Sequence, residues 1–355
     1  MVKLNETGVL HWSMILPILT VVAIGLIGAR ILGGSQAATA VTNGNIYFDR
    51  NVAYKSDLTT KTSQLTFPAA FTNCNNTGTA YMGVNQTGKT VAAVCKDSAN
   101  AMKKLTTYPT TSTTGIKQIA TVPAAFWAGQ PRWQKAKVGT QNLQILTREF
   151  DTTRSIWVFV QYDSVTGARK LVKVGGTDNF VGTYNSVNYD WSADGKKILY
   201  VAVDSNNAAT TKQIKMTSCA VDISLTAPTK TCGATITVSG AVVGLVSWSY
   251  ASDKVSFTTL STAYSAENAK VTTALFTANA NLTGIKKLTT TPAGQTFYAA
   301  VWSPDSQSLV VSVRNIAKTP SNGWMQIRSA STGAVTKQVA DDAGLFGAIL
   351  KWMPV

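Results

Sequence analysis

The sequence has almost no histidine. Its one copy, His11, stands near the N-terminus, so residues 41–355 contain none. Ser-His-Asp and Cys-His catalysis need an imidazole that accepts the nucleophile's proton, and zinc, copper and non-haem iron sites commonly use His ligands. No Gly-x-Ser-x-Gly elbow is present, and no glycine-rich phosphate loop precedes a helix. These absences predict that the protein is not an enzyme and uses no metal or cofactor.

Acidic residues are also scarce. Asp and Glu number 17 against 32 Lys and Arg, which gives a formal net charge of +15. Such an excess creates a positive field that attracts polyanions. No run of Lys or Arg exceeds two residues and no nucleic-acid motif appears, so nucleic acid is disfavoured as a partner. One pair of carboxylates close in sequence is Glu149 and Asp151. Arg148 and Arg154 flank this pair, so we interpret it as surface ion pairs rather than a glycosidase pair.

What the sequence has is a recurring tryptophan. It ends a short apolar run and opens a turn, most clearly in Trp191-Ser-Ala-Asp-Gly-Lys-Lys and Trp302-Ser-Pro-Asp-Ser-Gln-Ser. A degenerate copy without Trp begins at Val84, and the copies are spaced 49 to 58 residues apart. A fixed period of this size indicates a repeat architecture, and Ser, Asp, Gly and Pro between apolar runs indicate a β-hairpin. We expect the Trp side chains to pack between neighbouring sheets; they are Trp133, Trp191, Trp248, Trp302 and Trp352.

A second turn, Thr-Gly followed by Lys or Arg, lies 18 to 24 residues before the next Trp position. Each repeat therefore contains two hairpins, and four-stranded sheets repeated radially form a β-propeller. The last copy, Trp352, has a first strand and nothing after it, whereas the domain begins near Ile46 with what looks like later strands. We predict an all-β protein: a six-bladed propeller in which the N-terminal and C-terminal strands share the closing blade, since this pairing removes exposed sheet edges.

The Trp-Ser-x-Asp-Gly-Lys-Lys motif, together with the Lys-Leu-Thr steps at 104–106 and 287–289, resembles the repeat of TolB-like six-bladed propellers. The resemblance covers roughly residues 41–355 and implies the propeller fold. TolB itself has an α/β domain before its propeller, and we expect none here. The resemblance therefore implies the fold without the role in the Tol system.

The N-terminal part differs in composition from the rest of the chain. After a tail of residues 1–11, residues 12–32 form an almost wholly apolar segment, and this segment is long enough to span a bilayer as a helix. A cleaved signal peptide is the alternative, because Ala38-Thr39-Ala40 offers a small-x-small site. Residues 33–40 are interpreted as a linker and residues 41–355 as the propeller domain. Both alternatives place the propeller outside the cytoplasm, on the cell membrane or secreted.

Four cysteines follow the apolar segment. An even count in an exported domain indicates disulfides, for which three pairings are open. Because partners close in sequence lie at the ends of predicted hairpins, we favour Cys74 with Cys95 and Cys219 with Cys232. The rival interpretation, zinc, lacks a Cys-x-x-Cys pair and a nearby His.

Binding residues concentrate on loops that a rigid scaffold holds. Two irregular stretches, 121–137 and 313–324, combine aromatic side chains with cations. The residues predicted to bind a ligand are Phe126, Trp127, Arg132, Lys135, Arg314, Lys318 and Trp324. The function expected is a membrane-anchored, non-catalytic binding module for a protein or an anionic envelope polymer. The alternatives are a carbohydrate-active enzyme with paired carboxylates at the channel mouth, and a self-associating surface protein.

Overall fold

The fold is that of a computed structural model, in which the chain divides into Met1–Ala40 and a compact unit, Val41–Val355. The residues that the structure describes all belong to the second unit. They are 45–49, 53–56, 62–64, 82–96, 102–110, 112, 114–179, 181, 186–206, 213–239, 242–260, 273–315, 322–339 and 348–353. The predicted tail, apolar segment and linker lie outside them. Within this described part, no helix is long and apolar enough to cross a membrane.

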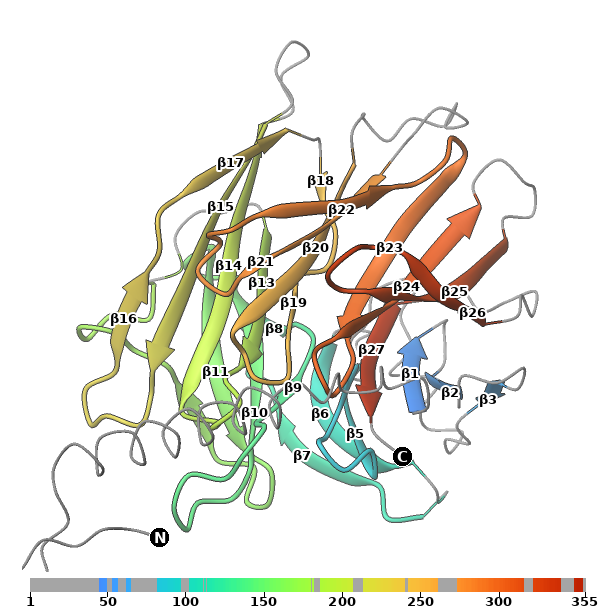
Figure 1. Cartoon of the computed structure of the whole chain (residues 1–355). Helices are drawn as coiled ribbons and strands as arrows, with labels where there is room; N and C mark the ends of the chain where they lie inside the picture. Colours follow the sequence, from blue (N-terminus) through green and yellow to red (C-terminus); the bar gives the residue numbers. More distant parts are fainter. Residues whose placement is uncertain are drawn as a thin grey trace, which may run out of the picture. The chain divides into compact units, whose positions relative to one another are not determined.

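Antiparallel strands form six sheets in the described residues, and five of these sheets are each built from one continuous stretch of chain (Figure 1). Blade 1 contains β4 (Met82–Val84), β5 (Thr90–Lys96), β6 (Met102–Pro109) and β7 (Lys117–Thr121). Blade 2 contains β8 (Phe126–Ala128), β9 (Arg132–Trp133), β10 (Gln144–Asp151), β11 (Ile156–Asp163) and β12 (Arg169–Leu171). Blade 3 contains β13 (Ser186–Trp191), β14 (Lys197–Asn206), β15 (Gln213–Asp222), β16 (Thr229–Cys232) and β17 (Ile236–Ser239).

The remaining two continuous sheets follow the same order. Blade 4 contains β18 (Val242–Val243), β19 (Ser247–Trp248), β20 (Lys254–Leu260), β21 (Thr273–Asn279) and β22 (Lys286–Thr290). Blade 5 contains β23 (Gln295–Trp302), β24 (Ser308–Asn315), β25 (Asn322–Ser329) and β26 (Val335–Val339). The all-β propeller predicted from the sequence is therefore confirmed.

The sixth sheet joins the two ends of the domain. Its strand order is β27 (Ala348–Met353), β1 (Asn45–Asp49), β2 (Ala53–Ser56) and β3 (Thr62–Gln64). Figure 1 shows β27, in red, running beside β1, in blue, and the register places Trp352 opposite Ile46. The predicted pairing of the two ends is confirmed. Of this sheet's side chains, however, only Trp352 has a described burial, so the structure describes five complete blades rather than the six expected.

The innermost strands contact one another in sequence. Strand β4 contacts β9, β9 contacts β13, β13 contacts β19, β19 contacts β23, β23 contacts β27, and β27 contacts β4. This circuit returns to its starting strand. It brings together the first strands of sheets that are far apart in the chain.

The Trp motif forms the expected turn. In blade 3 the Ser192 hydroxyl donates to Asp194 and accepts from the amide of Lys197, at 2.6 and 2.9 Å. Ser303 makes the equivalent bonds to Asp305 and the amide of Ser308 in blade 5. These side chains satisfy backbone groups at the tip of the hairpin, which is why short polar residues recur there.

The Trp side chains pack between blades, as predicted. Trp133, Trp191, Trp248 and Trp302 are at most 9% exposed, and each belongs to an apolar cluster formed by two neighbouring sheets. Indole also supplies a directed bond that Phe could not make. The Nε1 of Trp191 donates to the carbonyl of Arg132 on the preceding inner strand, at 2.9 Å.

The Thr-Gly turns join the blades at their outer strands. Gly167 has φ +75°, and a Cβ there would meet the carbonyl oxygen of Ile119, in blade 1, at 2.0 Å. Only glycine fits this approach. Beside it, Lys117 Nζ donates to the carbonyl of Val165 at 2.6 Å, and Lys286 Nζ repeats the contact on Ser331 of blade 5 at 2.5 Å. These lysines connect neighbouring blades, in addition to covering edge strands with charge.

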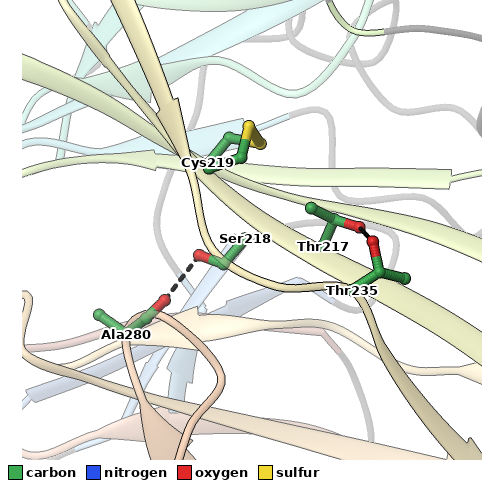
Figure 2. Close-up of a disulfide and its surroundings, with 6 residues drawn as sticks. Thr217, Ser218, Cys219, Thr235 and Ala280 are labelled. Carbon is green, nitrogen blue, oxygen red and sulfur yellow. Dashed lines mark hydrogen bonds between the residues drawn. A yellow bond between two sulfur atoms is a disulfide. The ribbon is translucent and has the colours of Figure 1, made fainter.

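One predicted disulfide is confirmed. Cys219 on β15 and Cys232 on β16 are bonded, with their Cα atoms 4.0 Å apart, and they stand opposite each other in the strand register. Figure 2 shows the surroundings of Cys219, where Ser218 donates to the carbonyl of Ala280 in blade 4 at 2.6 Å. Cys95 is also disulfide-bonded. Its predicted partner, Cys74, lies outside the described residues, so that pairing stays a prediction.

Candidate functional site

A cavity lies where the inner strands of blades 1 to 5 converge. Its volume is about 70 Å³, which is room for a few waters or one small polar group. Trp133, Trp248 and Trp302 form apolar parts of its lining. Its charged lining residues, within the described part of the chain, are Arg132, Lys135 and Asp190.

Two of these charges are paired. Lys135 Nζ lies 2.8 Å from Asp190 Oδ2, and the two side chains are 11% and 25% exposed. Burial raises the pKa of Asp190, but the Lys135 ammonium and the Arg132 guanidinium lower it by more, so its pKa is below the usual value. The carboxylate is therefore ionised near neutral pH. Its Oδ1 also accepts from the amide of Trp191 at 2.8 Å, which fixes its orientation.

Arg132 is the third charge. It takes part in none of the ion pairs found among the described residues, and its Nε is buried without a hydrogen-bond partner there. A buried donor without an acceptor costs about 1–3 kcal/mol, and more when the group is charged. An oxyanion in the cavity would supply acceptors to this guanidinium, since the planar fork of Arg matches carboxylate and sulfate oxygens.

Two tyrosines also line the cavity. Tyr189 donates to the carbonyl of Gln130 and accepts from the amide of Arg148, which ties blade 3 to blade 2. Tyr250 donates to the carbonyl of Trp352 on β27. Burial raises the pKa of both phenols, and the Asp190 charge raises that of Tyr250 further. Both are neutral at physiological pH, so the net charge of the lining comes from two cations and one carboxylate.

The structure places the seven residues predicted to bind a ligand at several locations. Arg132 and Lys135 line the cavity. Phe126 and Trp127 are on β8, where the Phe126 ring lies 4.6 Å from the Arg169 guanidinium. Arg314 and Trp324 are on β24 and β25 of blade 5, and Lys318 lies outside the described residues. The structure thus brings two of the seven together.

Two further cavity residues, Asp190 and Tyr250, were not predicted from the sequence, because nothing in their local sequence distinguishes them from residues that only form the repeat.

The environment of the carboxylates Glu149 and Asp151 differs from the one expected from the sequence. Asp151 pairs with Arg154 at 2.6 Å, as a flanking ion pair. Glu149 is fully buried instead. It pairs with Arg169 at 2.7 Å and accepts from the Tyr162 hydroxyl at 2.5 Å. Alternation along β10 turns this side chain into the blade, where a partner two strands away neutralises it. The expectation of surface ion pairs is therefore wrong: Glu149 and Asp151 are both buried.

The described lining does not supply paired carboxylates. Asp190 is the one Asp or Glu in it. The described residues also hold no group of three or more His, Cys, Asp or Glu that could bind a metal ion. This part of the chain therefore does not favour the alternative of a glycosidase-like pair at the channel.

The segment Gly83–Thr90 has the residue pattern of a phosphate-binding loop, Gly-x-x-x-x-Gly-Lys-Thr. A phosphate-binding loop needs a strand, free backbone amides and a following helix. Here the segment is the hairpin between β4 and β5. The amides of Lys89 and Thr90 are bound to Asn85 Oδ1, at 3.1 and 3.2 Å, and the amide of Gly88 to the Asn85 carbonyl. These amides are occupied, so the pattern carries no phosphate site.

Comparison with known proteins places the fold in the β-propeller class. No family model matches the sequence, and no curated protein does. Similar solved structures include a putative TolB from Agrobacterium tumefaciens, 11% identical with a TM-score of 0.50 over 88% of this chain and 99% of that one. A Kuenenia stuttgartiensis hydrazine synthase is 12% identical with a TM-score of 0.52, over 88% of this chain and 48% of that one. An oligogalacturonate lyase in complex with manganese is 12% identical, with a TM-score of 0.47 over 82% and 70%.

These likenesses show the fold alone, and they include a TolB-like propeller. They also correct one expectation. The prediction that the protein is not an enzyme is wrong as a deduction from the missing histidine, because the similar structures include an enzyme, the hydrazine synthase. At this identity no activity transfers from them to this chain.

Proposed function

We propose that the protein is a TolB-like propeller that binds an anionic ligand through the cavity at the convergence of its inner strands. The observation that supports this most is Arg132, a cation in the cavity with a buried Nε that has no hydrogen-bond partner among the described residues. The cavity carries two cations against one carboxylate, and the net charge of the chain, +15, attracts anions over a longer range.

The size of the cavity limits what enters it. About 70 Å³ admits one carboxylate or sulfate group but not a polymer backbone. We infer that an anionic envelope polymer contributes a single terminal or side-chain oxyanion to the cavity. The rest of the polymer contacts the exposed surface, where the interaction is weak and sensitive to salt.

Binding of a charged polymer to the full-length protein tests this proposal. We expect dextran sulfate to bind and neutral dextran of equal length not to bind, with affinity that falls as salt rises. Arg132→Gln should weaken binding of dextran sulfate at least fivefold. Arg314→Gln, which removes the same charge from blade 5, should change it less than twofold. Equal binding by Arg132→Gln and wild type would refute the cavity as the site.

We also propose that the sheet β27-β1-β2-β3 is a sixth blade that closes the ring. Two observations support this: β27 contacts both β23 and β4, and Trp352 is fully buried like the Trp residues of the other blades. Deletion of residues 348–355 would remove β27, one of the two strands that pair with β1. We expect such a variant to unfold at a lower temperature and to be cleaved faster by protease near residue 45.

We further propose that residues 12–32 anchor the protein in the cell membrane, with residues 41–355 outside the cytoplasm. The apolar run and the disulfide Cys219–Cys232 support this, since structural disulfides persist in oxidising compartments. Carbonate extraction of membranes should leave the protein in the pellet, and protease added to intact cells should digest the propeller. N-terminal sequencing that begins after Ala40 would show signal cleavage instead.

A further inference from the structure

The cavity lining includes a carboxylate, Asp190, beside its two cations. The inference drawn from this carboxylate rests on the proposed function, which is the binding of an anion in the cavity. Asp190 faces Lys135 at 2.8 Å in the same cavity where the Arg132 Nε has no hydrogen-bond partner among the described residues. The described lining thus holds one positive charge in excess. The phenols of Tyr189 and Tyr250 are neutral and do not change this balance.

A partly buried site favours a ligand that completes its charge balance. Uncompensated charge in a low-dielectric environment is costly, whereas a matched set of charges is tolerated. A monoanion brings the described lining to neutrality. A dianion leaves one negative charge in excess, close to the Asp190 carboxylate, which repels it.

Asp190 is held in place from two sides. Its Oδ1 accepts from the Trp191 amide and its Oδ2 from Lys135, each at 2.8 Å. Since strand β13 fixes the backbone, the carboxylate is a permanent part of the lining rather than a group that turns away when ligand enters. We propose that Asp190 is a specificity-determining residue, which makes the cavity select singly charged oxyanions such as carboxylates and sulfate monoesters over doubly charged phosphate monoesters.

Two probes of equal shape and different charge test the proposal. Methyl sulfate carries one negative charge, and methyl phosphate carries about two at pH 8, because its second pKa is about 6. Tryptophans 133, 248 and 302 line the cavity, so their fluorescence, checked by calorimetry, reports binding to the full-length protein. We expect the wild type to prefer methyl sulfate. Asp190→Asn keeps an oxygen for the Trp191 amide, and should shift the preference toward methyl phosphate by about tenfold.

Asp222→Asn is the matched control. It removes the same charge from the end of β15, outside the cavity lining, and should leave the preference unchanged. An unchanged preference in Asp190→Asn, with binding intact, would overturn the role of Asp190 while leaving the anion site in place. Absence of binding of either probe to the wild type would instead overturn the site itself. Thermal unfolding of both variants establishes that they fold. If Asp190→Asn does not fold, Asp190→Ser makes the same comparison.

Discussion

At the scale of the residue, the fourth position after each Trp-type position decides the shape of the turn. Its backbone is left-handed in four blades, with φ 66° at Gly88, 70° at Gly195, 63° at Ser252 and 59° at Ser306. Glycine adopts this conformation freely, whereas a residue with a Cβ is strained by about 1–2 kcal/mol. The two serines therefore store strain that the glycines avoid.

Ser252→Gly is expected to stabilise the protein. The change relieves the left-handed strain and removes a hydroxyl that is buried with no hydrogen-bond partner among the described residues. We expect the free energy of unfolding to rise by about 1 kcal/mol, measured by urea denaturation. Ser306→Gly relieves only the strain and should gain less. A fall in stability for Ser252→Gly would show that its hydroxyl has a stabilising role.

At the scale of the element, indole hydrogen bonds join neighbouring inner strands. Trp133 donates to Gly83, Trp191 to Arg132 and Trp302 to Ser247, at 2.9 to 3.1 Å. Each acceptor immediately precedes the Trp-type position of the preceding blade. The bond therefore recurs at the same position in these repeats. It fixes the position of one inner strand along its neighbour, in addition to the packing that any large aromatic side chain supplies.

Comparing two Trp→Phe variants isolates this bond. Trp191→Phe leaves the Arg132 carbonyl without its donor. We expect a loss of about 2–4 kcal/mol in the free energy of unfolding, from the bond and the lost volume. Trp248 is similarly buried, but its Nε1 has no partner among the described residues, so Trp248→Phe should cost at least 1 kcal/mol less. Equal losses in chemical denaturation would mean that volume alone accounts for both.

At the scale of the whole molecule, turn carboxylates in two neighbouring blades, 2 and 3, share one electrostatic behaviour. Backbone hydrogen bonds, from Thr166 first, outweigh burial and lower the pKa of Asp163 to about 2. The hydroxyls of Ser192 and Ser224 chiefly lower the pKa of Asp194 and Asp222. An unfolded Asp has a pKa of about 3.9, so these groups stabilise the fold fully above about pH 4.

The propeller should therefore lose stability as pH falls from about 4 to 2, through the folded-state pKa of Asp163. Asp163→Asn should be less stable than wild type at pH 7, and most of the difference should be lost by pH 2, where protonation has begun to remove the same bonds. Urea midpoints measured across this range test it. A difference between Asp163→Asn and wild type that is as large at pH 2 as at pH 7 would contradict the linkage.

The repeat made much of the fold predictable. Trp-Ser-x-Asp-Gly is a local signal, because its side chains bond to backbone groups within five residues, and the alternation after it is equally local. The pairing of β27 with β1 also followed from the incomplete last copy. Only part of the candidate site could be predicted from the sequence. Arg132 and Lys135 stood out as cations in an irregular stretch, but Asp190 lies in the next repeat and reaches Lys135 only because β13 packs beside β9.

The sequence by itself determined the class of fold, the turns and the burial of the tryptophans, and it favoured the pairing of Cys219 with Cys232, since each depends on contacts within a repeat or on its period. Only the tertiary structure decided which charges meet. Glu149 is buried and pairs with Arg169, and Asp190 lies in a cavity that also contains two cations. The physical reason is that these pairs join residues from different strands or blades, and their energies depend on burial, which no local pattern encodes.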